Sequence, residues 1–161
     1  MMKRDINDFW VWLQISFDFS AEKYALSGVD QSLNQFEDCY PHYDDMLNCC
    51  FEAINQSDFT DDEICDILTV MAFDNEAESV LEYLEVKLSE SDLHRFIRLG
   101  LCHRLFEARW QLAELIFRRK PNNHQEYLEI LAKDNSEYVR WRAKNALNSI
   151  KMGKTGDGSV S

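Results

Sequence analysis

The sequence contains few of the residues that make tight turns. Only five glycines and two prolines occur among its 161 residues. A β-rich domain of this length needs more of both, because glycine supplies positive φ angles and proline fixes the φ of a turn's first central residue. Apolar residues make up 45% and charged residues 29%, the balance of a globular chain. The composition therefore argues against a β-rich fold and favours helices.

Long apolar runs are also missing. The most apolar segment, residues 9–19, is interrupted by Gln14, Ser16 and Asp18, and no small-residue cleavage site follows it. A membrane-spanning helix needs about 20 apolar residues, and an export signal needs a cleavage site. We therefore expect this segment to be a buried helix, with no membrane association and a cytoplasmic location.

The cysteines do not form the even set that a disulfide framework requires. An odd number with one adjacent pair is typical of a reducing compartment. Cys39 and His42 have the spacing of a metal-ligand pair, but the second separated pair of a zinc site is absent. We expect thiols that pack as small apolar groups, and no metal or other cofactor. The five are Cys39, Cys49, Cys50, Cys65 and Cys102.

Basic residues are scarce in the first part of the chain. Residues 1–90 carry 21 acidic and four basic side chains, whereas residues 91–161 carry eight acidic and 13 basic ones, and the whole chain has a net charge of −12. An acidic surface repels phosphate backbones and attracts basic proteins. The charge therefore predicts a basic protein as the partner and argues against nucleic acid.

Apolar residues recur every three or four positions along most of the chain, which is the period of an amphipathic helix. Thr60 and Glu63 have the spacing of a capping box, and Asp74 and Ser91 are predicted to cap later helices. We expect a single all-α domain of eight or nine helices over residues 1–152, followed by a disordered tail, residues 153–161. The predicted helices cover about residues 5–26, 30–41, 43–54, 60–71, 74–88, 91–101, 106–119, 127–131 and 136–150.

The C-terminal part has a pattern of two short helices joined by a polar turn. Residues 127–132 supply the first helix, Asp134 and Asn135 the turn, and residues 139–147 the second helix, with an apolar residue, Arg140 and then small apolar residues. This pattern resembles a HEAT-type repeat and is clearest over residues 92–150. The resemblance implies that the turn aspartate caps the second helix and that the repeat arginine contacts neighbouring turns.

Weaker echoes of this pattern occur upstream. Residues 108–110 (Ala-Arg-Trp) precede residues 139–141 (Val-Arg-Trp) by 31 positions, and residues 71–75 resemble residues 131–135, 60 positions later. Regular spacings of this kind favour stacked helix pairs. We therefore expect stacked antiparallel helix pairs in a HEAT-like right-handed solenoid. The alternative is a helical bundle without repeats.

Sequence motifs of catalysis are absent. The chain has no Gly-x-Ser-x-Gly, no His-Glu-x-x-His and no glycine-rich phosphate loop, and Gly153-Lys154-Thr155 lacks the earlier glycine of such a loop. We expect no enzymatic activity. The arginines after residue 90, interleaved with Trp110 and Trp141, leave nucleic-acid stacking as an alternative, which the overall charge opposes.

Acidic side chains gather in two places. One group surrounds the helix that Thr60 opens, where the helix dipole explains part of the cluster. The other lies on the helix that Asp74 is predicted to cap, beyond its first turn, where the dipole has faded. We predict that both groups form a partner-binding surface. The predicted residues are Asp44, Asp45, Asp58, Asp61, Asp62, Asp66, Glu78, Glu82 and Glu85.

Small size, acidity, an aromatic content of 12% and the lack of a catalytic motif are together similar to helical immunity proteins of contact-dependent growth inhibition and related polymorphic toxin systems. The resemblance implies an inhibitor that binds a cognate toxin domain, such as a basic nuclease that cleaves tRNA or other RNA, and occludes its active site. A regulatory or scaffolding HEAT-like module that binds a protein is the alternative, and a nucleic-acid-binding HEAT-like protein is the third hypothesis.

Overall fold

The computed structural model describes residues 2–17 and 39–155, and these residues form eight α-helices and no strand. The all-α prediction is confirmed. The predicted helix over residues 30–41 and the end of the first helix fall mainly on residues 18–38, outside the described part. The helices are α1 (Met2–Phe17), α3 (Tyr43–Gln56), α4 (Asp61–Phe73), α5 (Ser79–Lys87), α6 (Glu90–Gly100), α7 (Phe106–Arg119), α8 (His124–Leu131) and α9 (Glu137–Thr155).

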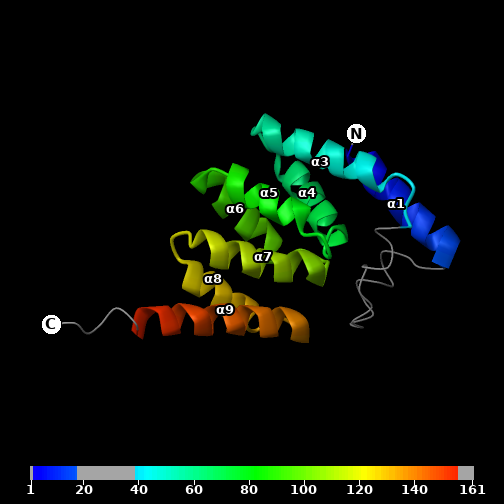
Figure 1. Ribbon diagram of the computed structural model, residues 1–161. Coiled ribbons are helices and arrows are strands. Elements are labelled where there is room, and N and C mark those ends of the chain that lie inside the picture. Colours follow the sequence, from blue (N-terminus) through cyan, green and yellow to red (C-terminus); the bar gives the residue numbers. More distant parts are fainter. Residues whose placement is uncertain (1, 18–38, 156–161) are drawn as a thin grey trace.

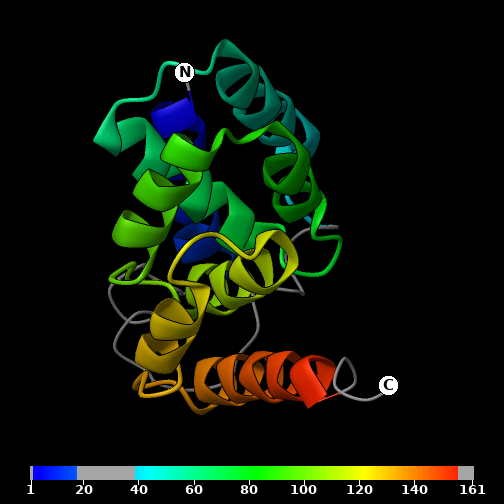
Figure 2. The same ribbon diagram turned by 90° about the vertical axis from the view of Figure 1, so that its left-hand side faces the viewer.

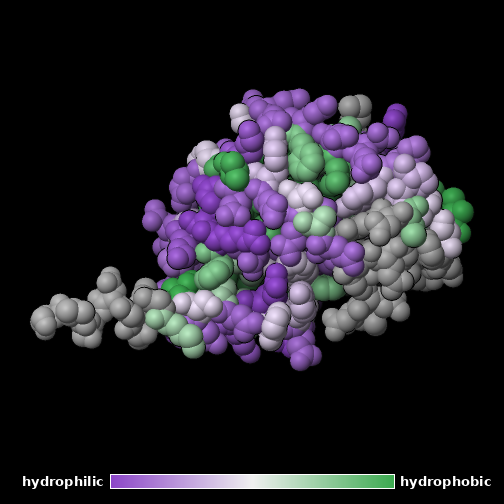
Figure 3. Space-filling view, viewed as in Figure 1, coloured by the Kyte–Doolittle hydropathy of each residue, from purple (hydrophilic) through white to green (hydrophobic). Residues whose placement is uncertain are grey.

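The helices stack between two ends of the molecule. Figures 1 and 2 both place α9 at one end and α3 at the opposite one. Between them, α7 packs against α4, α5 and α6 on one side and against α8 and α9 on the other, while α1 packs on α3 and α4. One apolar core runs through these layers. Hydrophilic residues cover most of the face in Figure 3, with apolar residues in separate small patches.

The start of α4 has the predicted capping box. The Thr60 hydroxyl accepts a hydrogen bond from the Glu63 backbone N–H at 3.2 Å, and the Glu63 carboxylate accepts one from the Thr60 N–H at 2.8 Å. The start of α6 differs from the prediction by two residues. Ser89, not Ser91, caps α6, because its hydroxyl accepts from the Asp92 backbone N–H at 3.1 Å.

Asp74 caps α5 although it is not the residue next to the helix in the sequence. It lies just after α4, and its carboxylate accepts hydrogen bonds from the Val80 N–H at 2.7 Å and the Tyr43 hydroxyl at 2.8 Å. Burial raises the pKa of this carboxyl in spite of these hydrogen bonds. The predicted helix over residues 74–88 is therefore shorter at its start. It begins at Ser79, after Glu78 with a left-handed φ of 55°.

Arg109 and Arg140, which are 31 residues apart in the sequence, make equivalent contacts in the structure. Arg109 Nη1 of α7 donates to the carbonyl oxygens of His103 and Arg104, six and five residues upstream, at 2.5 and 3.2 Å. Arg140 Nη1 of α9 donates to the carbonyl oxygens of Asp134 and Asn135, also six and five residues upstream, at 2.8 and 2.9 Å. Each arginine thus fastens its helix to the turn before it.

The last helix is longer than predicted. The periodicity indicated an end near Ile150, whereas α9 continues to Thr155 and so includes the first three residues of the predicted tail. Ser136 opens this helix: its hydroxyl accepts from the Val139 N–H at 3.4 Å, and the Asp134 carboxylate accepts from the Ser136 N–H at 2.8 Å. The cap of α9 is therefore Ser136 and not the predicted Asp134, whose carboxylate holds the backbone of the cap residue instead. Residues 156–161 lie outside the described part.

Candidate protein-binding surface

The acids predicted on α5 are partly occupied within the molecule. Arg118 of α7 forms ion pairs with Glu78 at 3.3 Å, Glu85 at 3.2 Å and Glu114 at 3.2 Å, and Arg142 of α9 adds a pair with Glu114 at 3.7 Å. The carboxylates raise the pKa of Arg118 although its partial burial acts in the opposite direction. Glu78 and Glu85 therefore join α5 to α7, and only Glu82 of the three remains fully exposed.

The explanation for these glutamates also changes. With Asp74 as the adjacent cap, the sequence predicts that all three lie beyond the first turn of their helix. Since α5 begins at Ser79, Glu78 is the cap position and Glu82 lies in the first turn, whereas Glu85 lies beyond it. The prediction is therefore correct for Glu85 and wrong for Glu78 and Glu82, because the backbone makes an additional turn between Asp74 and the helix.

At the start of α4, too, some acids are paired within the molecule and others are exposed. Arg95 of α6 donates to the Asp61 carboxylate at 2.9 Å and to the Phe59 carbonyl at 2.8 Å, which joins the two helices. The Glu63 carboxylate is engaged by Thr60, and the hydrogen bond from the Thr60 backbone lowers the pKa of this exposed group. Asp62 and Asp58 are exposed. The cluster is thus partly structural and partly open to solvent.

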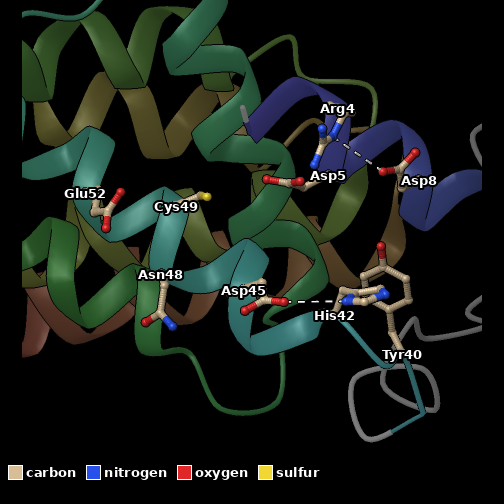
Figure 4. Close-up of a pocket in the computed structure, with 9 residues that line it drawn as sticks. All are labelled: Arg4, Asp5, Asp8, Tyr40, His42, Asp45, Asn48, Cys49 and Glu52. Carbon is tan, nitrogen blue, oxygen red and sulfur yellow. Dashed lines mark ion pairs between the residues drawn. The ribbon is translucent and has the colours of Figure 1, made fainter.

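A groove between α1 and α3 brings acids together from distant parts of the chain. Its volume is about 420 Å³. Apolar residues of α1 at helical spacing, including Ile6, Phe9 and Leu13, are buried in the core, and this orientation leaves Asp5 and Asp8 beside α3. The groove is lined by Arg4, Asp5, Asp8, Tyr40, His42, Asp45, Asn48, Cys49 and Glu52 (Figure 4).

The basic side chains of this groove make only exposed contacts with its acids. Arg4 lies 3.9 Å from Asp8, and His42 lies 3.5 Å from Asp45, with all four side chains largely exposed. Exposed pairs of this kind contribute little to stability, about 0–1 kcal/mol, because water and salt screen them.

The groove carries a negative potential that acts on its neutral side chains. Partial burial raises the pKa of Tyr40, and the charges of Asp8, Asp5 and Asp45 raise it further. Partial burial likewise raises the pKa of the Cys49 thiol, followed by its hydrogen bond to Asp5. Figure 4 shows Asp5 and Cys49 facing each other between the two helices. Acidic side chains of both α1 and α3 therefore contribute to the electrostatic potential inside this groove.

A second groove continues the first toward α4. Its volume is about 390 Å³, and it shares Cys49 and Glu52 with the first groove. Burial raises the pKa of Asp66, Lys3 lowers it, and nearby Asp62 and Glu63 raise it. The second groove is lined by Met2, Lys3, Cys49, Glu52, Ala53, Gln56, Glu63 and Asp66.

We call the two grooves together the acidic groove. Its lining residues include six carboxylates but only two side chains, Lys3 and Arg4, that are always positive. Of the predicted site residues, Asp45 and Asp66 line it, and exposed Asp44 is the neighbour of Asp45 on α3. The six carboxylates are Asp5, Asp8, Asp45, Glu52, Glu63 and Asp66.

Four carboxylates of this groove, Asp5, Asp8, Glu52 and Glu63, are not among the predicted site residues. Asp5 and Asp8 are three residues apart, and Asp45 and Glu52 are seven apart, so each pair lies on one face of its helix. This spacing was visible in the sequence. What was not visible is that α1 and α3 pack side by side, because that contact depends on tertiary structure.

The described residues contain no group of three or more His, Cys, Asp or Glu side chains placed to hold a metal ion. All five cysteines are free thiols, but only Cys50 is buried, while Cys39 and Cys102 are exposed. The expectation of buried thiols is therefore correct for Cys50 and wrong for the two exposed ones. None of the helices in the described ranges is long and apolar enough to span a membrane.

Comparisons with known proteins add no relative. No family model matches the chain, and neither the curated proteins nor the solved structures contain a match to it.

Proposed function

We propose that this chain is an immunity protein that binds a basic nuclease toxin through the acidic groove and neutralises it by covering its active site. The carrying observation is that α1, α3 and α4 direct six carboxylates into one continuous depression with only two permanent cations. A nuclease that cleaves tRNA or other RNA needs a positively charged cleft for phosphates. The carboxylates of the acidic groove can form ion pairs with the basic side chains of such a cleft.

Electrostatics also suits the kinetics of an inhibitor. A field of one sign steers an oppositely charged partner and accelerates association, and it repels wrong partners of like charge. The acids that Arg95 and Arg118 pair within the fold add little to this field, because each arginine offsets the charge of the carboxylate that it contacts. The contacts themselves come from the groove. In this proposal the chain acts in the cytoplasm, needs no cofactor and catalyses no reaction.

A second candidate is a regulatory or scaffolding module with HEAT-like architecture that binds a protein. The equivalent roles of Arg109 and Arg140 favour it, because repeated helix pairs fastened at the same position are typical of such scaffolds. Both candidates bind a protein through the chain's surface. They differ in the partner: only the first requires a toxin.

The immunity function can be tested with the gene next to the one that encodes this chain. We expect its product to be a basic nuclease whose cleavage of RNA stops when one equivalent of this chain is added. Association should slow as salt rises, because screening weakens the steering field. A neighbour without nuclease activity, or one that this chain does not inhibit, would contradict the immunity function.

Charge reversal then tests the groove itself. Asp45→Lys with Glu52→Lys changes two exposed acids of α3 and should slow association and weaken inhibition. Glu126→Lys with Glu129→Lys changes two exposed acids of α8 by the same total charge at a remote site and should change association much less. Equal effects of the two double variants would show that net charge matters and that the groove does not.

A further inference from the structure

The outer face of α9 presents two ordered aromatic side chains at the end of the helix stack. Trp141 is 52% exposed and Tyr138 is 37% exposed, and their rings stack with centroids 5.7 Å apart. Buried Trp110 meets the Tyr138 ring edge-on at 5.7 Å, and the Arg142 guanidinium lies 4.4 Å from the Trp110 ring. Trp110 and Arg142 therefore support the aromatic pair from the inner side of α9, and the outer side of the pair faces solvent.

The charge of the last two helices differs from that of the rest of the molecule. The exposed charged side chains of residues 124–152 comprise three acids and three lysines, in a chain with a net charge of −12. Rigid Trp and Tyr on a surface without net charge are the composition of a protein interface core. The six charges are Glu126, Glu129, Glu137, Lys133, Lys144 and Lys151.

The order of charges along one face of α9 is self-complementary. Glu137, Trp141 and Lys144 follow one another at four- and three-residue spacing, so all three lie on one face of the helix, with the acid toward its start and the lysine toward its end. Two such helices in antiparallel orientation oppose acid to lysine twice, whereas parallel helices oppose like charges. Antiparallel helix dipoles also attract each other.

We propose that this face binds the same face of a second copy of the chain, with the two α9 helices antiparallel. Trp141 lies near the two-fold axis, and Glu137 lies opposite Lys144 of the second copy. A two-fold contact of this kind uses one patch on both subunits and closes at the dimer. It leaves the acidic groove free, because α9 lies at the end of the stack opposite to α3 (Figure 1).

Sedimentation of the purified chain over a range of concentrations tests the proposal. We expect a reversible monomer–dimer equilibrium. Trp141→Lys should raise the dimer dissociation constant at least roughly thirtyfold, the effect typical of a tryptophan at an interface centre. Val86→Lys is the matched control, because Val86 is an exposed apolar residue, 79% exposed, on a different helix, α5. A chain that remains a monomer up to millimolar concentration overturns the proposal.

A charge exchange tests the antiparallel register. Glu137→Lys alone and Lys144→Glu alone each oppose like charges and should weaken the dimer, whereas the double variant Glu137→Lys/Lys144→Glu restores the attraction and should recover it. Circular dichroism of each variant verifies that α9 is still folded. If the double variant is as weak as the singles, or if Glu52→Lys in the acidic groove disrupts the dimer as strongly, the proposed contact is wrong.

Discussion

Arg109 and Asp134 form a two-point ion pair that joins α7 to the turn between α8 and α9. Arg109 Nε donates to Asp134 Oδ2 at 2.7 Å, and Arg109 Nη2 donates to Asp134 Oδ1 at 3.0 Å. The side chains are only 10% and 9% exposed. Arg109 Nη2 also donates to Asn135 Oδ1 at 2.9 Å. The same carboxylate accepts a hydrogen bond from the N–H of Ser136, the residue before α9, so it joins α7 to the turn that leads into α9.

Removing one side of this pair should therefore be costly. We expect Arg109→Ala to lower the free energy of unfolding by about 3–5 kcal/mol, because Asp134 is left buried and unpaired. Urea denaturation measures the loss. Arg98→Ala on exposed α6 surface is the control and should change stability by less than about 0.5 kcal/mol. Similar losses in both variants would show that the ion pair is unimportant.

Ala143 tests the close packing of the last helix. It is fully buried on α9, which packs against α7 and α8. Ala143→Arg should destabilise the fold by several kcal/mol, because a long charged side chain cannot fit between helices in contact. Asn148→Arg, at an exposed position of the same helix, should be tolerated. Thermal unfolding followed by circular dichroism compares them, and equal melting temperatures would contradict the packing.

Glu107 makes stability fall as pH rises. Its side chain is 1% exposed and neither carboxyl oxygen has a hydrogen-bond partner, so burial raises its pKa from 4.5 to about 8. The unfolded chain loses this proton above about pH 4.5 while the folded chain keeps it, and stability is therefore lost between about pH 4.5 and 8. Glu107→Gln should be several kcal/mol more stable than the parent at pH 8 and similar to it at pH 4. Denaturation curves at both pH values decide this, and a constant difference would contradict it.

His103 has the opposite dependence on pH. Burial, followed by the charge of Arg104, lowers its pKa from 6.5 to about 4. Its Nδ1 accepts from the Leu105 N–H at 3.2 Å, so the proton of the neutral ring is on Nε2, 3.1 Å from the Thr69 hydroxyl. The contribution of the neutral ring is complete above pH 6.5 and is lost as pH falls toward 4. We expect the ring signals of His103 in NMR spectra to stay constant from pH 8 to about 5. A midpoint near 6.5 would exclude the buried neutral ring.

The glutamates of α5 should not respond alike to charge reversal. Glu82 is exposed outside the Arg118 network, and Glu82→Lys should leave the melting temperature unchanged. Glu85→Lys places a cation beside Arg118 and should destabilise the fold by about 1 kcal/mol, a value limited by the partial exposure of the pair. Equal melting temperatures for the Glu82 and Glu85 variants would show that the ion pair with Arg118 does not stabilise the fold.

The sequence by itself determined the helical class, most helix positions and the special role of two arginines. These features are local: a 3.6-residue apolar period, a Thr60–Glu63 capping pair and the distance from Arg140 to its own turn all lie within a few residues. The helix starts that the sequence predicts incorrectly depend on which of several neighbouring residues acts as the cap. Both Ser89 and Ser91 can cap a helix, and the choice between them follows from how α6 packs.

Only the tertiary structure decided which acids are open to a partner. Charge counts alone could not tell Glu85, which is paired with an arginine 33 residues away, from Glu52, which lies in the acidic groove. Nor could they assign Asp5 and Asp8 to the same groove as Asp45, because that requires α1 to lie beside α3. Electrostatic interactions act through space, so the position of every other charge has to be known before the role of any one acid can be assigned.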